Sequence, residues 1–170
     1  MSAATVSFRT ISPDDEPFLR QVYASTRLDE LAPLGWSAEQ QAAFLGQQFD
    51  AQHRYYQEHY ADAAFQVILL DRLPIGRLYV ARWLDQILVI DIALLPEHRN
   101  AGIGSRLLRD LLQEGATTGK PVRIHVEKFN PALRLYERLG FAPIANQGVY
   151  WFMEWSPHRA ASSELALSDS

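Results

Sequence analysis

One short stretch, lying between an apolar run and an amphipathic run, constrains the fold of this chain more than any other. Residues 87–95 are apolar except for a single aspartate and predict a buried strand, which Pro96 ends because proline cannot donate a ladder hydrogen bond. Residues 103–112 then carry leucines at helical spacing between charged residues. The glycines of the connecting segment, Gly102 and Gly104, are therefore expected at a helix N-terminus.

Such a segment can bind an anion. The first N–H groups of a helix are unpaired, the dipole is positive there, and small residues let a ligand approach the backbone. A P-loop would need Lys-Ser or Lys-Thr after its last glycine, and a dinucleotide site would need a different glycine spacing. The alternative is a turn that binds nothing. The predicted phosphate loop consists of Arg99, Asn100, Ala101, Gly102, Ile103, Gly104 and Ser105.

A second motif lies at residues 130–141. Asn130 can cap a helix, Pro131 suits the first helical position, and Gly140 suits the position just after the C-cap. Tyr136 is expected at the edge of the helix's apolar stripe. The motif predicts a short helix with well-specified ends.

The two motifs resemble the GNAT (general control non-repressible related) superfamily of N-acetyltransferases. The pattern Arg-x-x-Gly-x-Gly resembles the family's acetyl-CoA pyrophosphate loop, and Asn-Pro-Ala, Leu-Tyr-Glu and Gly-Phe follow in the family's order. The resemblance implies an α/β fold with a central twisted, mostly antiparallel sheet flanked by helices. It also implies acetyl transfer from acetyl-CoA to a primary amine of a small molecule or peptide, by direct attack in a ternary complex.

Length and hydropathy predict one GNAT-type domain over residues 1–155 and a disordered tail over 156–170, because 48% hydrophobic residues suffice for a core. The expected order of elements is β, α, α, β, β, β, α, β, α, β, β. The expected strands are 6–11, 65–70, 75–81, 87–95, 122–126 and 150–155, with one further strand after Gly140. The expected helices start near 12, 37, 103 and 130.

Composition excludes several classes of function. The chain has no cysteine, which removes a disulfide scaffold, a thiolate nucleophile and cysteine zinc sites, and no metal is expected. A net charge of −4 argues against nucleic acid as a partner. No apolar run approaches the roughly 20 residues that span a bilayer, so we expect a cytoplasmic protein without membrane contact. The sequence leaves room for a homodimer.

The resemblance also assigns roles to residues near the thioester. Backbone groups of Ile92, Ala93 and Leu94 would hold the pantetheine arm and polarise the acetyl carbonyl. Tyr136 would protonate the CoA sulfur, and Asn130 would contact the cofactor besides capping. The structural alternative for Tyr136 is a ring packed on the sheet with its hydroxyl in water.

Three routes compete for the proton of the amine. His125 stands where several family members carry a glutamate base, and an imidazole can accept a proton near neutral pH. Asp91 is the charge within 87–95, and a buried carboxylate must be paired, hydrogen-bonded or functional. Pairing with Arg123 or Arg77 is its structural explanation. Direct proton loss to ordered water is the third route.

The resemblance implies that the acceptor lies against the first two helices and the final hairpin, where aromatic rings favour a cation. Trp36, Tyr55 and Tyr150 are the predicted acceptor residues, although core packing explains such residues equally well. The identity of the amine does not follow. Two other functions stay open: a non-catalytic acyl-CoA-binding regulatory module, and a scaffold whose glycines only shape turns.

Overall fold

The structure, a computed structural model, describes residues 4–159 of the 170-residue chain. Within this part, the order of strands and α-helices is the one that the sequence predicts. The strands are β1 (Val6–Thr10), β2 (Ala64–Leu70), β3 (Leu73–Arg82), β4 (Ile87–Leu94), β5 (Val122–Glu127), β6 (Ala142–Gln147) and β7 (Tyr150–Trp155). The helices are α1 (Glu16–Leu31), α2 (Ala38–His59), α3 (Ile103–Thr118) and α4 (Leu133–Arg138), with short 3₁₀ turns at Pro13–Asp15, Ala32–Leu34 and Pro96–His98.

The described residues form two compact units. Unit 1 comprises residues 4–79 and 91–101, and unit 2 comprises residues 80–90 and 102–159. The chain crosses from one unit to the other within β3, within β4 and just before α3.

In unit 1, β1 pairs antiparallel with β2, with Val6 opposite Leu70. Asp71 and Arg72 join β2 to β3 with φ angles of 48° and 73°. Two consecutive left-handed residues are typical of a type I′ hairpin turn, whose twist matches that of the flanking strands. β3 therefore begins at Leu73, two residues before the start expected at 75.

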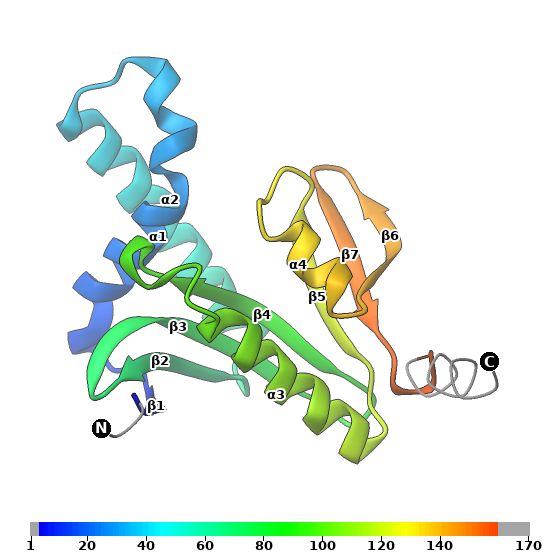
Figure 1. The fold of residues 1–170 in the computed structure, drawn as a ribbon. Coiled ribbons are helices and arrows are strands. Elements are labelled where there is room, and N and C mark those ends of the chain that lie inside the picture. Colours follow the sequence, from blue (N-terminus) through cyan, green and yellow to red (C-terminus); the bar gives the residue numbers. More distant parts are fainter. Residues whose placement is uncertain (1–3, 160–170) are drawn as a thin grey trace. The chain divides into compact units, whose positions relative to one another are not determined.

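The two helices of unit 1 lie side by side (Figure 1). Ser37 begins α2 with a capping box: its hydroxyl accepts from the Gln40 N–H at 3.1 Å, and the Gln40 side chain accepts from the Ser37 N–H at 2.9 Å. The apolar faces of the helices meet in one buried cluster. Its members are Leu19, Tyr23, Leu31, Leu45 and Phe49, with Trp36 packed at its edge.

In unit 2, β7 pairs antiparallel with both β5 and β6 (Figure 1). Helix α3 packs closely here. A Cβ on Gly115 would lie 2.7 Å from the Lys120 carbonyl oxygen and 3.0 Å from the Trp155 ring, so only glycine fits at this position. The leucines of α3 that the sequence predicted as its buried face, Leu107, Leu108, Leu111 and Leu112, are buried.

The described strands form one sheet in the order β1-β2-β3-β4-β5-β7-β6. β4 and β5 run parallel, whereas β1–β2, β5–β7 and β6–β7 are antiparallel. The sheet is therefore mixed and mostly antiparallel, and helices flank it. The predicted fold class is confirmed.

The helix predicted from residue 130 starts later than expected. α4 begins at Leu133, with Ala132 as its N-cap. The Asn130 side chain accepts from the Ala132 N–H at 2.8 Å, which closes a turn before the helix. The prediction of Asn130 as helix cap is wrong, because the asparagine satisfies a loop N–H instead. Gly140, with φ 102°, follows the C-cap Leu139 as predicted.

The predicted tail, 156–170, lies mostly outside the described residues, which end at 159. Arg159 belongs to the described part. Its guanidinium donates to the Gly140 carbonyl at 3.1 Å and to the Glu154 carbonyl. The start of the segment is thereby attached to unit 2.

Candidate active site

The loop before α3 contains two residues in the left-handed region. Asn100 has φ 61° and Gly102 has φ 84°, and Gly102 is the N-cap of α3. The Arg106 N–H donates to the Gly102 carbonyl at 3.0 Å, which closes the first helical turn. A Cβ at Gly102 would meet no atom within 4 Å. The position therefore needs glycine for its backbone angle, not for lack of space within the protein.

The start of α3 has the geometry of an anion site. Gly102 offers no capping side chain, so the N–H groups of residues 103–105 have no acceptor within the helix. Residues 100–102 are exposed. Because the free N–H groups and the dipole both favour negative charge, this end of α3 fits a phosphate.

Arg99 ties the loop to other parts of unit 1. Its Nε donates to the Leu94 carbonyl at 2.9 Å, and its Nη2 donates to the Ser25 hydroxyl at 3.1 Å. Two of its donors thus hold the loop against the end of β4 and against α1. Sequence reasoning did not identify this anchoring role, because Ser25 is distant in sequence.

The backbone of β4 lies close to β3 at residues 92–94. A Cβ on Gly76 would lie 2.2 Å from the Ala93 carbonyl oxygen, so a larger residue would push the strands apart. β4 pairs with β5 from Ile87 to Val89 and continues to Leu94. The three residues with a predicted pantetheine role follow the last of these pairs, and all are half-buried.

Asp91 forms an ion pair with Arg77 of β3. Arg77 Nη2 lies 2.8 Å from Asp91 Oδ2, and the side chains are 3% and 16% exposed. Of the two partners that the sequence allowed, the structure selects Arg77. Arg123 pairs with Glu154 of β7 instead.

Helix α2 contributes two further groups to this ion pair. The Tyr56 hydroxyl donates to Asp91 Oδ2 at 3.2 Å, and the Gln52 side chain accepts from Arg77 Nη2 at 2.9 Å. We call Gln52, Tyr56, Arg77 and Asp91 the Asp91 cluster.

Aromatic rings enclose the guanidinium of the cluster. Arg77 Cζ lies 5.1 Å from the Tyr79 ring centroid and 5.9 Å from that of Tyr23, within the range of cation–π attraction. Burial is the largest influence and disfavours the charge of Arg77, but the interactions with Asp91, Tyr79 and Tyr56 together outweigh it and raise the pKa of Arg77. Burial likewise raises the pKa of Tyr79, although the charge of Arg77 opposes that shift. Arg77 therefore carries its charge at any physiological pH.

Tyr136 lies in α4 of unit 2 and is 5% exposed. Its ring meets Phe141 edge-on at 5.9 Å between centroids, and its carbonyl accepts from the Phe141 N–H at 3.0 Å. These contacts fix the orientation of the ring. The turn held by Asn130 leads directly into this helix.

His125 is exposed on β5, opposite Phe152 of β7. The two rings stack at 4.5 Å with 21° between their planes. Partial burial lowers the pKa of His125. A hydrogen bond with Gln147 acts in the opposite direction but is the smaller effect. The imidazole is consequently neutral at pH 7, as a proton acceptor must be.

The predicted acceptor residues have different surroundings. Trp36 packs on Phe44 at 5.1 Å, at the edge of the helical core, and Tyr55 is 49% exposed. A helix rises about 1.5 Å per residue, so about 16 Å separates Phe44 from Tyr55 along α2. Trp36 and Tyr55 thus do not lie against one small ligand. Tyr150 of unit 2 is 38% exposed at the start of β7.

The structure adds Tyr56, the neighbour of the predicted acceptor residue Tyr55, as a contact of Asp91. Gln52 and Tyr56 are four residues apart and share one face of α2, whereas Tyr55 is turned about 100° away from Tyr56. The i, i+4 spacing of Gln52 and Tyr56 was available as a signal. The missing information was which face of α2 meets Asp91.

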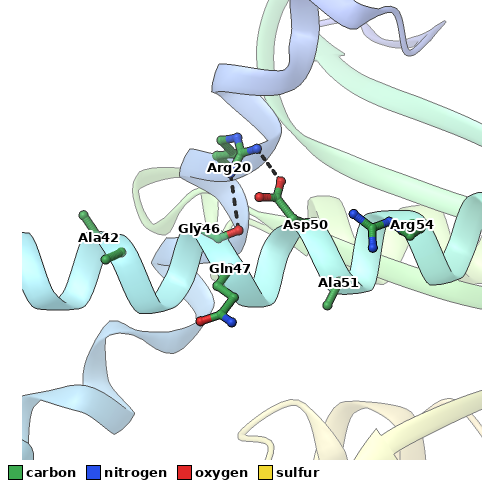
Figure 2. A pocket seen from close by; sticks show the side chains of 8 residues that line it. Arg20, Ala42, Gly46, Gln47, Asp50, Ala51 and Arg54 are labelled. Carbon is green, nitrogen blue, oxygen red and sulfur yellow. Dashed lines mark hydrogen bonds and ion pairs between the residues drawn. The ribbon is translucent and has the colours of Figure 1, made fainter.

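A hollow opens on another face of α2, beside α1 (Figure 2). Arg20 of α1 donates to the Gly46 carbonyl at 3.4 Å and pairs with Asp50. Asp50 and Arg54 flank Gln52 at two residues on each side, so they lie on roughly the opposite side of the helix from the Asp91 cluster. The hollow is therefore separate from that cluster.

The described residues 4–159 lack two features. They contain no group of three or more His, Asp or Glu side chains placed to hold a metal ion. They also contain no helix that combines the length and apolar character needed to cross a membrane.

Comparison with known proteins identifies the family. The acetyltransferase (GNAT) family matches residues 27–141, which is more than half of the chain and includes residues of both units. The chain belongs to this family of acetyltransferases, and the resemblance seen in its two motifs is confirmed. No curated protein sequence matches the chain at a significant level.

Solved structures share the fold at low identity. An N-acetyltransferase, PaiA, from Thermoplasma acidophilum in complex with coenzyme A is 19% identical with a TM-score of 0.67, covering 89% of this chain and 99% of that one. Naa50 from Arabidopsis thaliana, in complex with the bisubstrate analogue CoA-Ac-MVNAL, is 16% identical with a TM-score of 0.58, covering 89% and 98%. A spermidine N-acetyltransferase SpeG chimera from Vibrio cholerae and hSSAT is 19% identical with a TM-score of 0.60, covering 91% and 96%.

Proposed function

We propose that this chain transfers the acetyl group of acetyl-CoA to a primary amine of a small molecule or peptide, by direct attack in a ternary complex. The observation that carries the proposal is the exposed, glycine-capped N-terminus of α3 directly after β4. The PaiA structure holds coenzyme A, the Naa50 structure holds the bisubstrate analogue CoA-Ac-MVNAL, and SpeG is a spermidine N-acetyltransferase. These proteins support a CoA thioester as donor and an amine as acceptor.

The pyrophosphate is assigned to the loop 99–105. Its free N–H groups would bind the phosphate oxygens, while Arg99 holds the loop in place. Backbone groups of Ile92, Ala93 and Leu94 would bind the pantetheine arm and polarise the acetyl carbonyl. Asn130 would contribute through the turn that precedes α4.

The reaction joins the amine nitrogen to the acetyl carbon and breaks the carbon–sulfur bond. The amine loses one proton, and the departing thiolate gains one. Tyr136 is assigned as the acid for the sulfur, since its phenol can donate and its ring is fixed by Phe141.

The amine proton has two side chains available as acceptors, besides water. His125 is supported by its lowered pKa, which keeps the imidazole neutral at pH 7. Asp91 is supported by its position on β4, one residue before the assigned thioester backbone.

The acceptor is assigned to the aromatic surroundings of these groups. Tyr55 and Tyr150 expose enough ring to contact an amine, and Trp36 would act through the packing of α2. We also propose that both units act as one catalytic domain over residues 1–155. We also propose a homodimer and a location in the cytoplasm, and the absence of cysteine agrees with a reducing compartment.

The direct test mixes the protein with acetyl-CoA and a set of amines and measures free thiol. Thiol release with an acetylated product would support the proposal. Binding of acetyl-CoA without release for any amine would favour the non-catalytic acyl-CoA-binding module. Replacing Tyr136 by Phe should lower kcat by about 10²- to 10⁴-fold while the Kd for acetyl-CoA stays unchanged.

The loop has its own test. We expect Gly102→Val to raise the Kd for acetyl-CoA at least about tenfold, since valine disfavours a positive φ and covers the free N–H groups. Gly119→Val is the matched control, because Gly119 has φ 70° and open space but caps the other end of α3. Both variants should lose stability, and only Gly102→Val should lose acetyl-CoA binding. Equal acetyl-CoA affinity in the two variants would remove the loop from the site.

A further inference from the structure

The Asp91 carboxylate uses its two oxygens unequally. Arg77 Nη2 and the Tyr56 hydroxyl both donate to Oδ2, at 2.8 and 3.2 Å. Among the described residues, none donates a hydrogen bond to Oδ1. An ionised carboxylate accepts up to about four hydrogen bonds, so Oδ1 retains its full capacity.

The donors to Oδ2 fix the orientation of this carboxylate. Arg77 cannot move toward solvent, because its side chain is 3% exposed and Gln52 accepts from the same Nη2. Tyr56 approaches from α2, whereas Arg77 approaches from β3. With its position set from two elements, Asp91 cannot easily rotate to satisfy Oδ1 elsewhere.

The cluster also carries an energetic cost that packing does not explain. Arg77 is buried, and its Nε makes no hydrogen bond of good geometry within the described residues. Apolar residues of similar volume often replace a buried ion pair without loss of stability. A charged pair with an unused donor on one side and an unused acceptor on the other is therefore better explained by binding than by stability.

The location of Asp91 suits an acceptor. Residues of a strand are spaced by about 3.3 Å, so Asp91 lies within about 10 Å of all three backbone positions assigned to the thioester. Its side chain is 16% exposed, which allows a small group to reach it.

We propose that Asp91 binds the positively charged amino group of the acceptor through Oδ1, and that Arg77 is a positioning residue that fixes Asp91 for this contact. The proposal rests on the acetyltransferase function proposed above and specifies its substrate class. The acceptor is an aliphatic primary amine, which is protonated before binding, with no carboxylate next to the amine. A neutral arylamine would gain nothing from Asp91, and a neighbouring carboxylate would be repelled by it.

The first experiment compares substrate classes with wild-type protein. Pentylamine, aniline and glycine serve as the cationic, the neutral and the carboxylate-bearing probe, within the wider amine set of the thiol assay. The expected result is acetylation of alkylammonium compounds, with weaker or no acetylation of the other two classes. Acceptors found only among arylamines or α-amino acids would overturn the assignment of Asp91 and leave the acetyltransferase function standing. Acetyl-CoA binding without acetylation of any amine would overturn the proposed function itself.

The second experiment tests Asp91 directly. Asp91→Asn should raise KM for the best alkylamine by about 10- to 100-fold, since a hydrogen bond to a charged group is lost. KM for aniline, or its inhibition constant if it is not acetylated, should stay within about twofold. Arg123→Gln removes a cross-strand arginine of unit 2 and should change neither value. An equal effect of Asp91→Asn on both probes would show that Asp91 does not read the charge of the acceptor.

The third experiment separates positioning from stability. Arg77→Lys keeps the charge but loses the planar guanidinium, so KM for the alkylamine should rise about tenfold with little change in kcat. In the Asp91→Asn background, Arg77→Lys should add almost nothing. If Arg77→Lys does not fold, Tyr56→Phe replaces it, because that variant removes only one donor to Oδ2. Additive effects on KM, or an altered melting temperature with unchanged KM, would show that the cluster is merely structural.

Discussion

Two arginine–carboxylate pairs of this chain use the same chemistry in different surroundings. Arg77 and Asp91 in unit 1, and Arg123 and Glu154 in unit 2, each join two strands with a nitrogen–oxygen distance of 2.8 Å. Arg123 is 28% exposed, and its Nε, Nη1 and Nη2 all reach acceptors on Glu154 or Gln86. Arg77 is 3% exposed and uses one nitrogen for two acceptors.

The difference shows what burial adds to an ion pair. The Arg123 pair can exchange with water, so removing one partner leaves a charge that solvent can stabilise. The Arg77 pair cannot do this as easily, since aromatic rings surround the guanidinium. A buried pair holds its two side chains in one geometry. For Asp91, this fixed position contributes more to binding than to the stability of the fold.

The largest difference in stability between the two pairs is expected when the arginine of each pair is replaced. Arg77→Met should lower the free energy of unfolding by about 3 kcal/mol, because it leaves Asp91 without its partner in a largely buried position. Arg123→Met should lower it by at most about 1 kcal/mol. Urea denaturation of both variants measures the difference. Equal losses would mean that burial does not distinguish the pairs.

Replacing both members of the buried pair should recover stability without recovering function. In the Arg77→Met, Asp91→Leu double variant, no unpaired charge is left, so the loss in unfolding free energy should shrink to within about 1 kcal/mol of wild type. The alkylamine KM should stay raised. Urea denaturation and the thiol assay together check this. A double variant as unstable as Arg77→Met alone would show that the pair holds the sheet together.

A smaller effect is expected from replacing Tyr56, which contacts the Arg77–Asp91 pair. Tyr56→Phe should lower the free energy of unfolding by about 1 kcal/mol, since it removes a hydrogen bond to the Asp91 carboxylate. Tyr55→Phe is the control at the next position, where the side chain is 49% exposed, and should change stability very little. Thermal melting of both variants provides the measurement. The same melting temperature for the two would contradict the role of Tyr56.

The smallest effect concerns His125, which is two residues from Arg123. Burial lowers its pKa in the folded state below the usual value near 6.5, so the unfolded chain binds more protons in the window below pH 6.5. Stability should therefore decrease as pH falls through that window, and His125→Gln should reduce the decrease. If His125 accepts the amine proton, the variant should also lose the acidic limb of kcat/KM. His59→Gln, on α2, is the control. Unchanged pH profiles in His125→Gln would leave water or Asp91 as the acceptor.

Local patterns of the sequence predicted the elements well. The order of strands and helices is confirmed within the described residues, Ser37 starts α2 where predicted, and Gly140 follows the end of α4 where predicted. These features depend on hydropathy period and on turn chemistry, which act over a few residues. Asn130 is the exception. Its side chain can satisfy either a helix or a loop N–H, and the sequence does not state which one will lie nearby.

The candidate site was less predictable, because it depends on contacts between distant residues. The sequence left Asp91 with two possible arginines and gave no reason to prefer Arg77. It also did not show that Tyr56, next to the predicted acceptor residue Tyr55, would reach Asp91. A helix turns by about 100° per residue, so an uncertainty of one position changes which side chain faces the sheet.

By itself, the sequence determined the family and the place of the glycine-containing loop before α3. A strand, a loop with a left-handed glycine and an amphipathic helix are adjacent in the chain, and local backbone preferences suffice to form them. Only the tertiary structure decided how the charge of Asp91 is used. Its partners come from α2 and β3, at separations of 35 and 14 residues, and no local preference encodes which distant side chain meets a buried carboxylate. The need to satisfy a buried charge required some partner, and the packing of the sheet and helix selected Arg77 and Tyr56.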